Sequence, residues 1–158
     1  MPEIRFDYLD PDDVEVRAIL DASDAFYDGL YPAESNHIES VEDLKKPGVL
    51  LIGCRLDGVL VASAAAKLMD DDGEYAEIKR VFVFDAYRGR GLSAKIMVYL
   101  ETELQKRGVS LFRLETGVRQ PEAIGLYRKL GYRERDPFGA YRPDPLSVFM
   151  EKRESLSI

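Results

Sequence analysis

A glycine-bearing loop between an apolar strand and an amphipathic helix constrains the fold of this chain more than any other feature. The strand covers residues 74–84, the loop carries Gly89 and Gly91, and the helix runs to about residue 107, where Gly108 ends it. A second apolar strand follows at residues 111–116. Two strands joined through a helix lie parallel in one sheet, so these segments predict a βαβ crossover.

The chain before this crossover is predicted to form antiparallel strands. Apolar and polar residues alternate over residues 4–8, and the turn Leu56-Asp57-Gly58 separates apolar runs at residues 49–55 and 59–68. A second turn at residues 70–73 leads into the strand of the crossover. The strands at residues 49–55, 59–68 and 74–84 are therefore predicted to form an antiparallel meander.

Two helices are predicted between the first strand and the meander. Asp10 and Pro11 are the residue types of a helix cap and a first helical residue, and apolar residues continue at helical spacing to about Gly29. A short helical stretch begins at Ser40. Residues 31–37 between the two helices are polar and aromatic without a period, which predicts a loop.

The end of the chain adds a helix and two strands. Pro121 opens the helix, Gly131 closes it, and strands are expected at residues 132–135 and 147–152. The sequence thus predicts an α/β fold of the α+β type. We expect one domain over residues 1–158, with a mixed, mostly antiparallel sheet flanked by helices.

Composition and charge limit the classes of partner. With 46% hydrophobic and 32% charged residues, the chain has a globular composition. The net charge of -7 argues against a nucleic-acid partner, because such proteins gain affinity by neutralising phosphates with basic side chains. The charge fits an amine-bearing partner, and the alternative is that it serves solubility alone.

Cys54 is the only cysteine, which excludes an intramolecular disulfide and a zinc site built on several thiolates. We expect it to pack in the core. No stretch has the apolar length of a signal peptide or a membrane span. We therefore expect a cytoplasmic protein with no metal and no membrane partner, and a homodimer is compatible with the sequence.

The loop at residues 87–93 has the chemistry of an anion site. Gly89 and Gly91 let the backbone approach a ligand closely, and the first N–H groups of the following helix are unpaired at its positive end. Arg88 and Arg90 supply charged donors to phosphate oxygens. The alternative is a surface turn whose arginines are merely solvated.

The same loop also fits the dinucleotide-binding pattern. Gly89, Gly91 and Ala94 have the spacing G-x-G-x-x-A, and Glu115 ends the next strand, where a ribose-binding acid would stand. In a dinucleotide domain, however, the glycines follow the first strand and further strand–helix units come after them. Here three predicted antiparallel strands precede the loop, which argues against that class.

Arg88-Gly89-Arg90-Gly91-Leu92-Ser93 resembles the pyrophosphate loop [QR]-x-x-G-x-[GA] of the GNAT superfamily of acetyltransferases, with Ser93 at the small final position. The segment from Gln120 to Tyr132 resembles a second motif of that family, N-x-x-A-x-x-L-Y-x-x-x-G-[FY], with Gln120 in place of Asn. The strand at residues 76–83 is similar to the family's fourth strand. Together the matches cover residues 74–135 in the family's order.

The resemblance implies a sheet that splays between its fourth and fifth strands to admit acetyl-CoA. The opened edge of the fourth strand, at Val81, Phe82 and Val83, would pair with the pantetheine amides. The other cofactor-binding residues that the resemblance implies are Arg88, Gly89, Arg90, Gly91, Leu92, Ser93, Gln120, Ala123 and Tyr127. The acetyl group would pass to an amine by direct attack, without an acyl-enzyme.

Tyr127 is the candidate general acid. The resemblance directs its hydroxyl at the sulfur of the thioester. A phenol, with a reference pKa of about 10, can supply a proton to a thiolate whose conjugate acid has a pKa of about 8.5. The alternative role is a helix tyrosine packed in the core.

Glu77 is the candidate base, at the position in the fourth strand where some members of the family carry a catalytic glutamate. A carboxylate with a reference pKa of about 4.3 does not readily deprotonate an ammonium near 10.4, so burial or a relaying water is required. The alternative is a strand glutamate that is solvated or paired with Lys79 or Arg80.

The loop after the first helix is the candidate acceptor wall. It carries Tyr31, Glu34 and His37, and Glu34 favours an approaching ammonium. His37 is the sole histidine and titrates near neutrality, which suggests catalysis, but we treat it as a substrate-binding candidate or a surface residue. Arg119 is suited to bind an acceptor carboxylate in bidentate fashion.

The sequence thus predicts an N-acetyltransferase that uses acetyl-CoA and the primary amine of a small metabolite. Two alternatives stay open. The acceptor is a protein N-terminus or lysine, or the chain is a CoA-binding sensor without turnover.

Overall fold

The computed structural model describes residues 2–154, whose strands form one sheet in the order β1-β2-β3-β4-β5-β7-β6. The first four strands, β1 (Ile4–Tyr8), β2 (Val49–Leu56), β3 (Val59–Met69) and β4 (Tyr75–Val83), pair antiparallel in sequence order. β4 pairs parallel with β5 (Leu111–Gly117), and β7 (Ser147–Arg153) pairs antiparallel with both β5 and β6 (Arg133–Arg135). The predicted mixed, mostly antiparallel sheet is confirmed.

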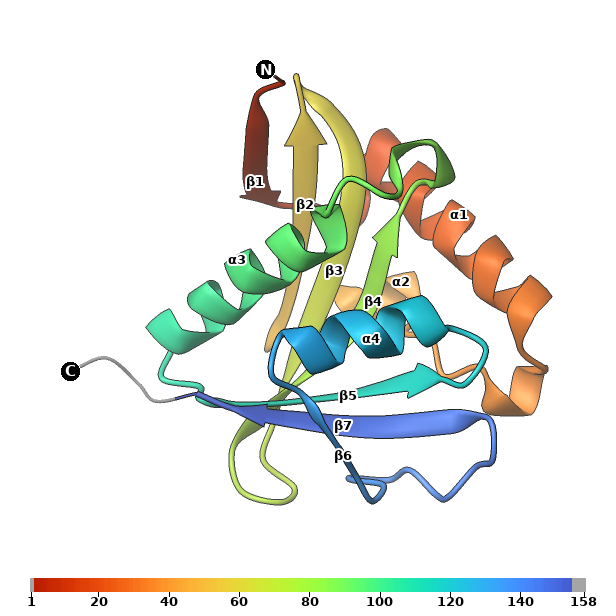
Figure 1. The fold of residues 1–158 in the computed structure, drawn as a ribbon. Helices are drawn as coiled ribbons and strands as arrows, with labels where there is room; N and C mark the ends of the chain where they lie inside the picture. Colours follow the sequence, from red (N-terminus) through yellow and green to blue (C-terminus); the bar gives the residue numbers. More distant parts are fainter. Residues whose placement is uncertain (1, 155–158) are drawn as a thin grey trace.

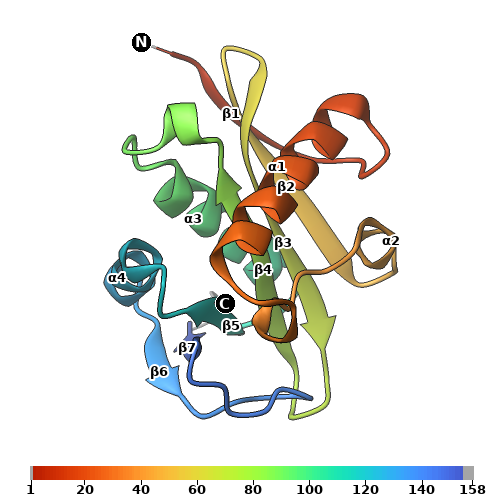
Figure 2. The same cartoon turned by 90° about the vertical axis from the view of Figure 1, so that its right-hand side faces the viewer.

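Helices cover both faces of the sheet. Figures 1 and 2 show α3 (Leu92–Lys106) and α4 (Pro121–Lys129) on one face, with α1 (Val14–Leu30) and α2 (Val41–Leu44) on the other. Two short 3-10 turns, η1 (Ala33–Ser35) and η2 (Asp85–Tyr87), lie in the loops after α1 and β4. The predicted order of the elements is therefore confirmed.

The start of α1 differs from the prediction made from Asp10 and Pro11. Asp13 is the N-cap, and residues 10–13 form a turn. The N–H of Asp13 donates to the carbonyl of Asp10 (3.1 Å), and the N–H of Asp12 donates to the Asp10 carboxylate (2.9 Å). The Asp10 side chain therefore stabilises a turn instead of a helix end, as aspartates commonly do.

The hairpin between β2 and β3 follows the prediction. Asp57 and Gly58 have φ values of 48° and 84°. Two-residue turns with positive φ at both positions match the twist of the strands that they join.

The sheet splays between β4 and β5. Their register is limited to three pairs, the last of which joins Ile78 and Leu114, although β4 continues to Val83. Arg80, with φ 55°, lies where the register between β3 and β4 shifts, which marks a bulge in β4. In Figure 1, β2 to β4 run upright while β5 and β7 run across them. The splay implied by the family resemblance is therefore confirmed.

The hydrophobic core fixes α3 against the sheet. Ile96, Met97, Leu100 and Leu104 of this helix are fully buried, and they belong to one cluster with side chains of β2 to β5. Each such burial stabilises the fold by about 1.5–3 kcal/mol. The N-terminus of α3 is thereby held at the end of β4.

Candidate active site

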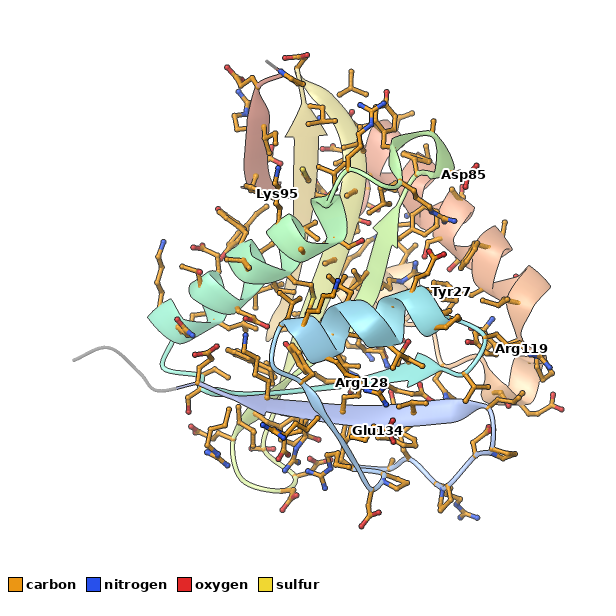
Figure 3. All side chains as sticks on the ribbon, viewed as in Figure 1. Tyr27, Asp85, Lys95, Arg119, Arg128 and Glu134 are labelled. Carbon is orange, nitrogen blue, oxygen red and sulfur yellow. The ribbon has the colours of Figure 1, made fainter. Side chains whose placement is uncertain are left out.

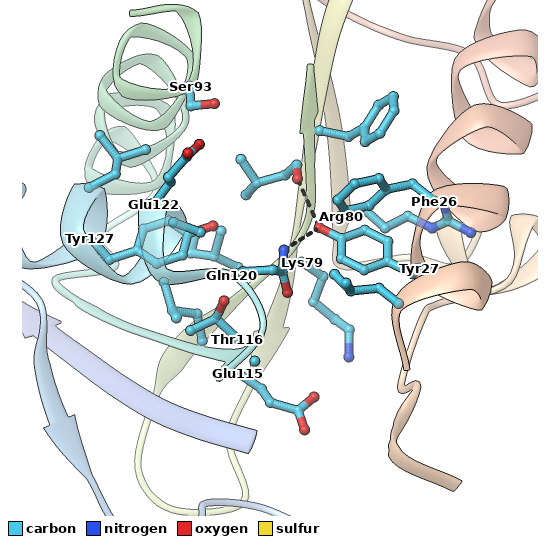
Figure 4. A pocket seen from close by; sticks show the side chains of 18 of the residues that line it. Phe26, Tyr27, Lys79, Arg80, Ser93, Glu115, Thr116, Gln120, Glu122 and Tyr127 are labelled. Carbon is cyan, nitrogen blue, oxygen red and sulfur yellow. Dashed lines mark hydrogen bonds between the residues drawn. The ribbon is translucent and has the colours of Figure 1, made fainter. Parts of the chain in front are cut away.

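The splay opens into a cleft of about 730 Å³ that reaches from the α3 N-terminus to the loop after α1. Figure 4 shows side chains from β4 and α1 facing side chains from β5 and α4 across it. Ligand sites commonly enclose about 300–1,000 Å³. The cleft is therefore large enough for a sizeable ligand.

One end of the cleft has the geometry of an anion site. Gly91 is the N-cap of α3, with φ 74°, and no side chain caps this helix. Gly89 also has a positive φ of 80°, and a Cβ built on either glycine meets no atom within 4 Å. The N-terminus of α3, the positive end of the helix, is therefore uncapped by any side chain and borders the cleft.

The two arginines of the loop lie differently. The Nε of Arg88 donates to the carbonyl of Val83 (3.2 Å), and its guanidinium lies over the rings of Phe26 and Phe82, at 4.8 and 5.6 Å from their centroids. Arg90 packs over the ring of Tyr87 at 5.2 Å and does not line the cleft. The structure thus brings Arg88 to the expected anion site, and Arg90 only to its neighbourhood.

Tyr127 lies on α4, with its hydroxyl directed into the cleft (Figure 4). The side chain is 7% exposed, and its ring packs edge-on against Tyr132. Burial raises the pKa of the Tyr127 phenol above its ordinary value, because the phenolate would be poorly solvated. The residue therefore keeps its proton at neutral pH, which is the state that a general acid requires.

A chain of hydrogen bonds crosses the cleft from the start of α4 to β4. Tyr31 receives the N–H of Arg119 (3.2 Å) and donates to Oε1 of Gln120 (3.1 Å). Nε2 of Gln120 donates to the hydroxyl of Tyr27 (3.3 Å), which donates to the carbonyl of Val81 (3.3 Å; Figure 4). The backbone at Val81 and Val83 is predicted to pair with pantetheine. In this structure the carbonyl of each residue accepts a hydrogen bond from a side chain, Tyr27 and Arg88 respectively.

Tyr27 was missed by the sequence analysis. It lies in the last turn of α1, four residues before Tyr31, the C-cap residue that donates its N–H to the carbonyl of Tyr27 (3.0 Å). Figure 3 shows Tyr27 between α1 and α4. Burial raises the pKa of both phenols, so both stay donors.

Gly117, at the end of β5, makes room for Tyr31. A Cβ built on this glycine would lie 1.8 Å from the Tyr31 hydroxyl. Real Cβ atoms do not approach other atoms so closely, so no larger residue fits here without moving Tyr31.

Glu77 lines the cleft from β4 but is 4% exposed and already engaged. Its Oε2 accepts the hydroxyl of Tyr141, and Nζ of Lys79 lies 3.3 Å away. Lys79 also pairs with Glu39 at 3.0 Å. Burial and the neighbouring Glu77 carboxylate raise the pKa of the Tyr141 phenol, so Tyr141 remains a donor to Glu77.

His37 lines the cleft from the loop after α1 and pairs with Glu115 of β5. Its Nδ1 is 2.7 Å from Oε2 of Glu115, and the hydroxyl of Ser147 donates to the same oxygen (2.8 Å). The His37 ring also packs edge-on against Tyr141. The sequence analysis considered Glu115 only as a ribose-binding acid and did not connect it with His37.

The two remaining acceptor candidates lie near the cleft. Glu34 lines a second cavity of about 520 Å³, which shares His37 and Tyr141 with the cleft. Arg119, labelled in Figure 3, lines the cleft, and its Nη1 donates to the carbonyl of Leu30 at the end of α1 (2.6 Å). Arg119 thus already bonds α1 in this structure.

The described part of the chain has neither a metal-binding cluster nor a membrane-spanning helix. Residues 2–154 contain no cluster of three or more His, Cys, Asp or Glu side chains arranged to hold a metal ion. Over the same residues, no helix is both long enough and apolar enough to cross a membrane.

Comparisons with known proteins agree with this geometry. A family model described as the acetyltransferase (GNAT) family matches residues 16–132. An IAA acetyltransferase of Azospirillum brasilense is 40% identical over 152 residues, which cover 96% of this chain and 99% of the relative. A crystal structure from Klebsiella pneumoniae, assigned as an acyl-CoA N-acyltransferase, is 33% identical, covers 97% of both chains and has a TM-score of 0.78.

A more distant structure shares the fold. The PaiA N-acetyltransferase of Thermoplasma acidophilum, solved with coenzyme A, is 20% identical, covers 96% of this chain and 99% of its own, and has a TM-score of 0.74. The family match includes β4, the loop before α3 and the start of α4, three of the segments that border the cleft. This chain therefore belongs to the GNAT family of acetyltransferases and is an acyltransferase.

Proposed function

We propose that the protein transfers the acetyl group of acetyl-CoA to the primary amine of a small molecule. The observation that carries this proposal is the uncapped N-terminus of α3, which opens onto the cleft between β4 and β5. Arg88 lines the same end and can contribute charge to a bound pyrophosphate. The family to which the chain belongs supports the assignment.

Acetyl-CoA would supply the acetyl group as a reactive thioester. The backbone from Gly89 to Ser93 would bind its pyrophosphate, and the edge of β4 would bind the amide chain once Tyr27 releases the carbonyl of Val81. Tyr127 would give its proton to the departing thiolate. Burial raises the pKa of this phenol, and burial in the same cleft would raise that of the thiol, so the transfer stays feasible.

The acceptor half of the cleft supports a small amine. The carboxylates of Glu77 and Glu115 line it, and the second cavity with Glu34 adjoins it. Carboxylates attract an ammonium group, and the net charge of -7 adds to this field. Arg119 at the mouth is available to a substrate carboxylate if it leaves Leu30.

A mass-spectrometric screen with acetyl-CoA tests the proposed acceptor class. The panel contains small amines, amino-acid-like compounds, IAA, and peptides with free N-termini or lysines. We expect acetylation of a small amine with release of one CoA per product. For the best acceptor, Glu34→Ala and Arg119→Ala are expected to raise the acceptor KM at saturating acetyl-CoA, because each removes a charge beside the binding space.

The alternatives give different outcomes in the same screen. Acetylation of long peptides only would assign the protein to the peptide-modifying class. Binding of acetyl-CoA without any acetylated product would favour a sensor. An acceptor KM that neither variant changes would remove the loop after α1 and the mouth of the cleft from the acceptor site.

A further inference from the structure

The contact between His37 and Glu115 fixes the tautomer of the imidazole. An ionised carboxylate only accepts hydrogen bonds, and the same Oε2 already accepts the hydroxyl of Ser147. The proton in the 2.7 Å contact therefore belongs to Nδ1 of His37. In the neutral ring this leaves a lone pair on Nε2, the atom that takes up a proton in base catalysis.

The position of Glu115 brings this pair to the point where the strands part. Ile78 and Leu114 are the last paired residues of β4 and β5, and both pack in the core on the α3 side. Glu115 is the next residue of β5, so its side chain points to the opposite face, where the loop after α1 carries His37. His37, Glu115 and Tyr127 all line the same cleft.

His37 is better suited to accept a proton than Glu77. The Glu77 carboxylate holds Tyr141 and Lys79 and is nearly inaccessible. The side chain of His37 is 35% exposed, and among residues 2–154 its Nε2 has no hydrogen-bond partner. The lone pair of Nε2 in the neutral ring is therefore open to an incoming ammonium, whereas the Glu77 carboxylate is not.

We propose that His37 is the general base for the acceptor amine and that Glu115, held by Ser147, is its positioning residue. This rests on the proposed function. Nε2 takes one proton from the ammonium and passes it to solvent, and the neutral amine attacks the thioester carbonyl. A carbon–nitrogen bond forms and the carbon–sulfur bond breaks. When the amide forms, the nitrogen loses a second proton. This proton returns to Tyr127, which has given its own proton to the thiolate.

The environment of the imidazole is mixed in charge. Acidic, basic and phenolic groups line the two cavities that His37 borders. Those nearest in the hydrogen-bonding network are Glu115 of β5, Glu77 and Lys79 of β4, Tyr141 and Asp144 before β7, and Glu39 before α2. Glu115 is the carboxylate that contacts the ring directly.

The tautomer can be measured without any acceptor. His37 is the sole histidine, so untagged protein labelled with ¹⁵N in its histidine ring gives one pair of ring-nitrogen signals. We expect the Nδ1–H tautomer in the neutral ring of the natural protein. Glu115→Gln is expected to lose this preference, because an amide group can donate as well as accept.

Kinetics of His37→Asn then test the base. The Asn amide N–H replaces the Nδ1 donor to Glu115, but nothing replaces Nε2. We expect kcat/KM for the acceptor to fall by about 10²-fold, with the acetyl-CoA KM changed less than about twofold. Free imidazole is expected to restore part of the activity of His37→Gly. As a control, Ser40 lines neither cavity, and Ser40→Ala removes its N-cap bond with the N–H of Asp43 at the start of α2 (3.1 Å). This variant should change kcat/KM less than about threefold.

Three results would overturn the proposal. An Nε2–H tautomer in an active enzyme contradicts the base role alone, and so does a His37→Asn variant that is as active as Ser40→Ala. A natural protein that acetylates no amine contradicts the proposed function and the base role together. The tautomer and the acceptor screen therefore distinguish the two failures.

Discussion

Replacement of Tyr127 by Phe is expected to lower kcat by about 10²–10⁴-fold, the usual contribution of a general acid. The ring packs against Tyr132 and is almost fully buried, so Phe keeps the packing and loses only the proton donor. The acetyl-CoA affinity should therefore stay close to that of the natural protein. The measurement is a single-turnover acetylation rate at saturating acetyl-CoA, with binding followed separately by calorimetry.

Tyr132→Phe is the matched control for this variant. In the natural protein the hydroxyl of Tyr132 donates to Glu101 (2.6 Å) in the core, and Tyr132 does not line the cleft. The variant should unfold more easily, because Glu101 loses one of its two partners, Tyr132 and Lys152. Its acetylation rate should remain that of the natural protein. Natural kcat in Tyr127→Phe, with chemistry shown to limit the rate, would remove Tyr127 from the acid role.

Replacement of Gly91 by Val is expected to raise the acetyl-CoA KM by at least about tenfold, a loss of about 1.4 kcal/mol of binding. Gly91 has φ 74° and opens on empty space at the N-terminus of α3. A valine would fill that space, and a β-branched residue strongly disfavours positive φ. The measurement is steady-state kinetics with acetyl-CoA varied at a fixed acceptor concentration.

Gly58→Val is the control that distinguishes backbone strain at a positive φ from loss of the cofactor site. Gly58 has φ 84° and equally open surroundings, but it lies in the turn between β2 and β3. Both variants should lose stability for the same backbone reason. Only Gly91→Val should raise the acetyl-CoA KM. Equal KM values in the two variants would show that the N-terminus of α3 does not bind the cofactor.

The parts of the fold that follow from short contiguous patterns could be predicted from the sequence. The turn at Asp57 and Gly58 and the crossover through α3 depend on residue types at fixed local spacing. The splay after β4 is what the family resemblance implies. The start of α1 could not, because Asp10 and Pro11 fit a turn as well as a helix cap. Only the hydrogen bonds of the folded chain distinguish the two.

The candidate site likewise contains residues that the sequence could predict and residues that it could not. The loop at Gly89 and Gly91 and the tyrosine at position 127 belong to motifs with their own spacing. His37 and Glu115, by contrast, are 78 residues apart and meet only because β5 ends beside the loop after α1. The bond from Tyr27 to Val81 joins residues 54 apart. Such pairs leave no local pattern, and a single sequence contains no signal for them.

Thermal unfolding in the presence of acetyl-CoA or NAD tests most directly whether the cleft between β4 and β5 is an acetyl-CoA site. A ligand that binds only the folded protein stabilises it by about 2.7 kcal/mol at a concentration of 100 Kd. We expect acetyl-CoA to raise Tm in a concentration-dependent way and NAD at the same concentrations to leave it unchanged. A rise with NAD and none with acetyl-CoA would contradict the proposed acetyl-CoA site.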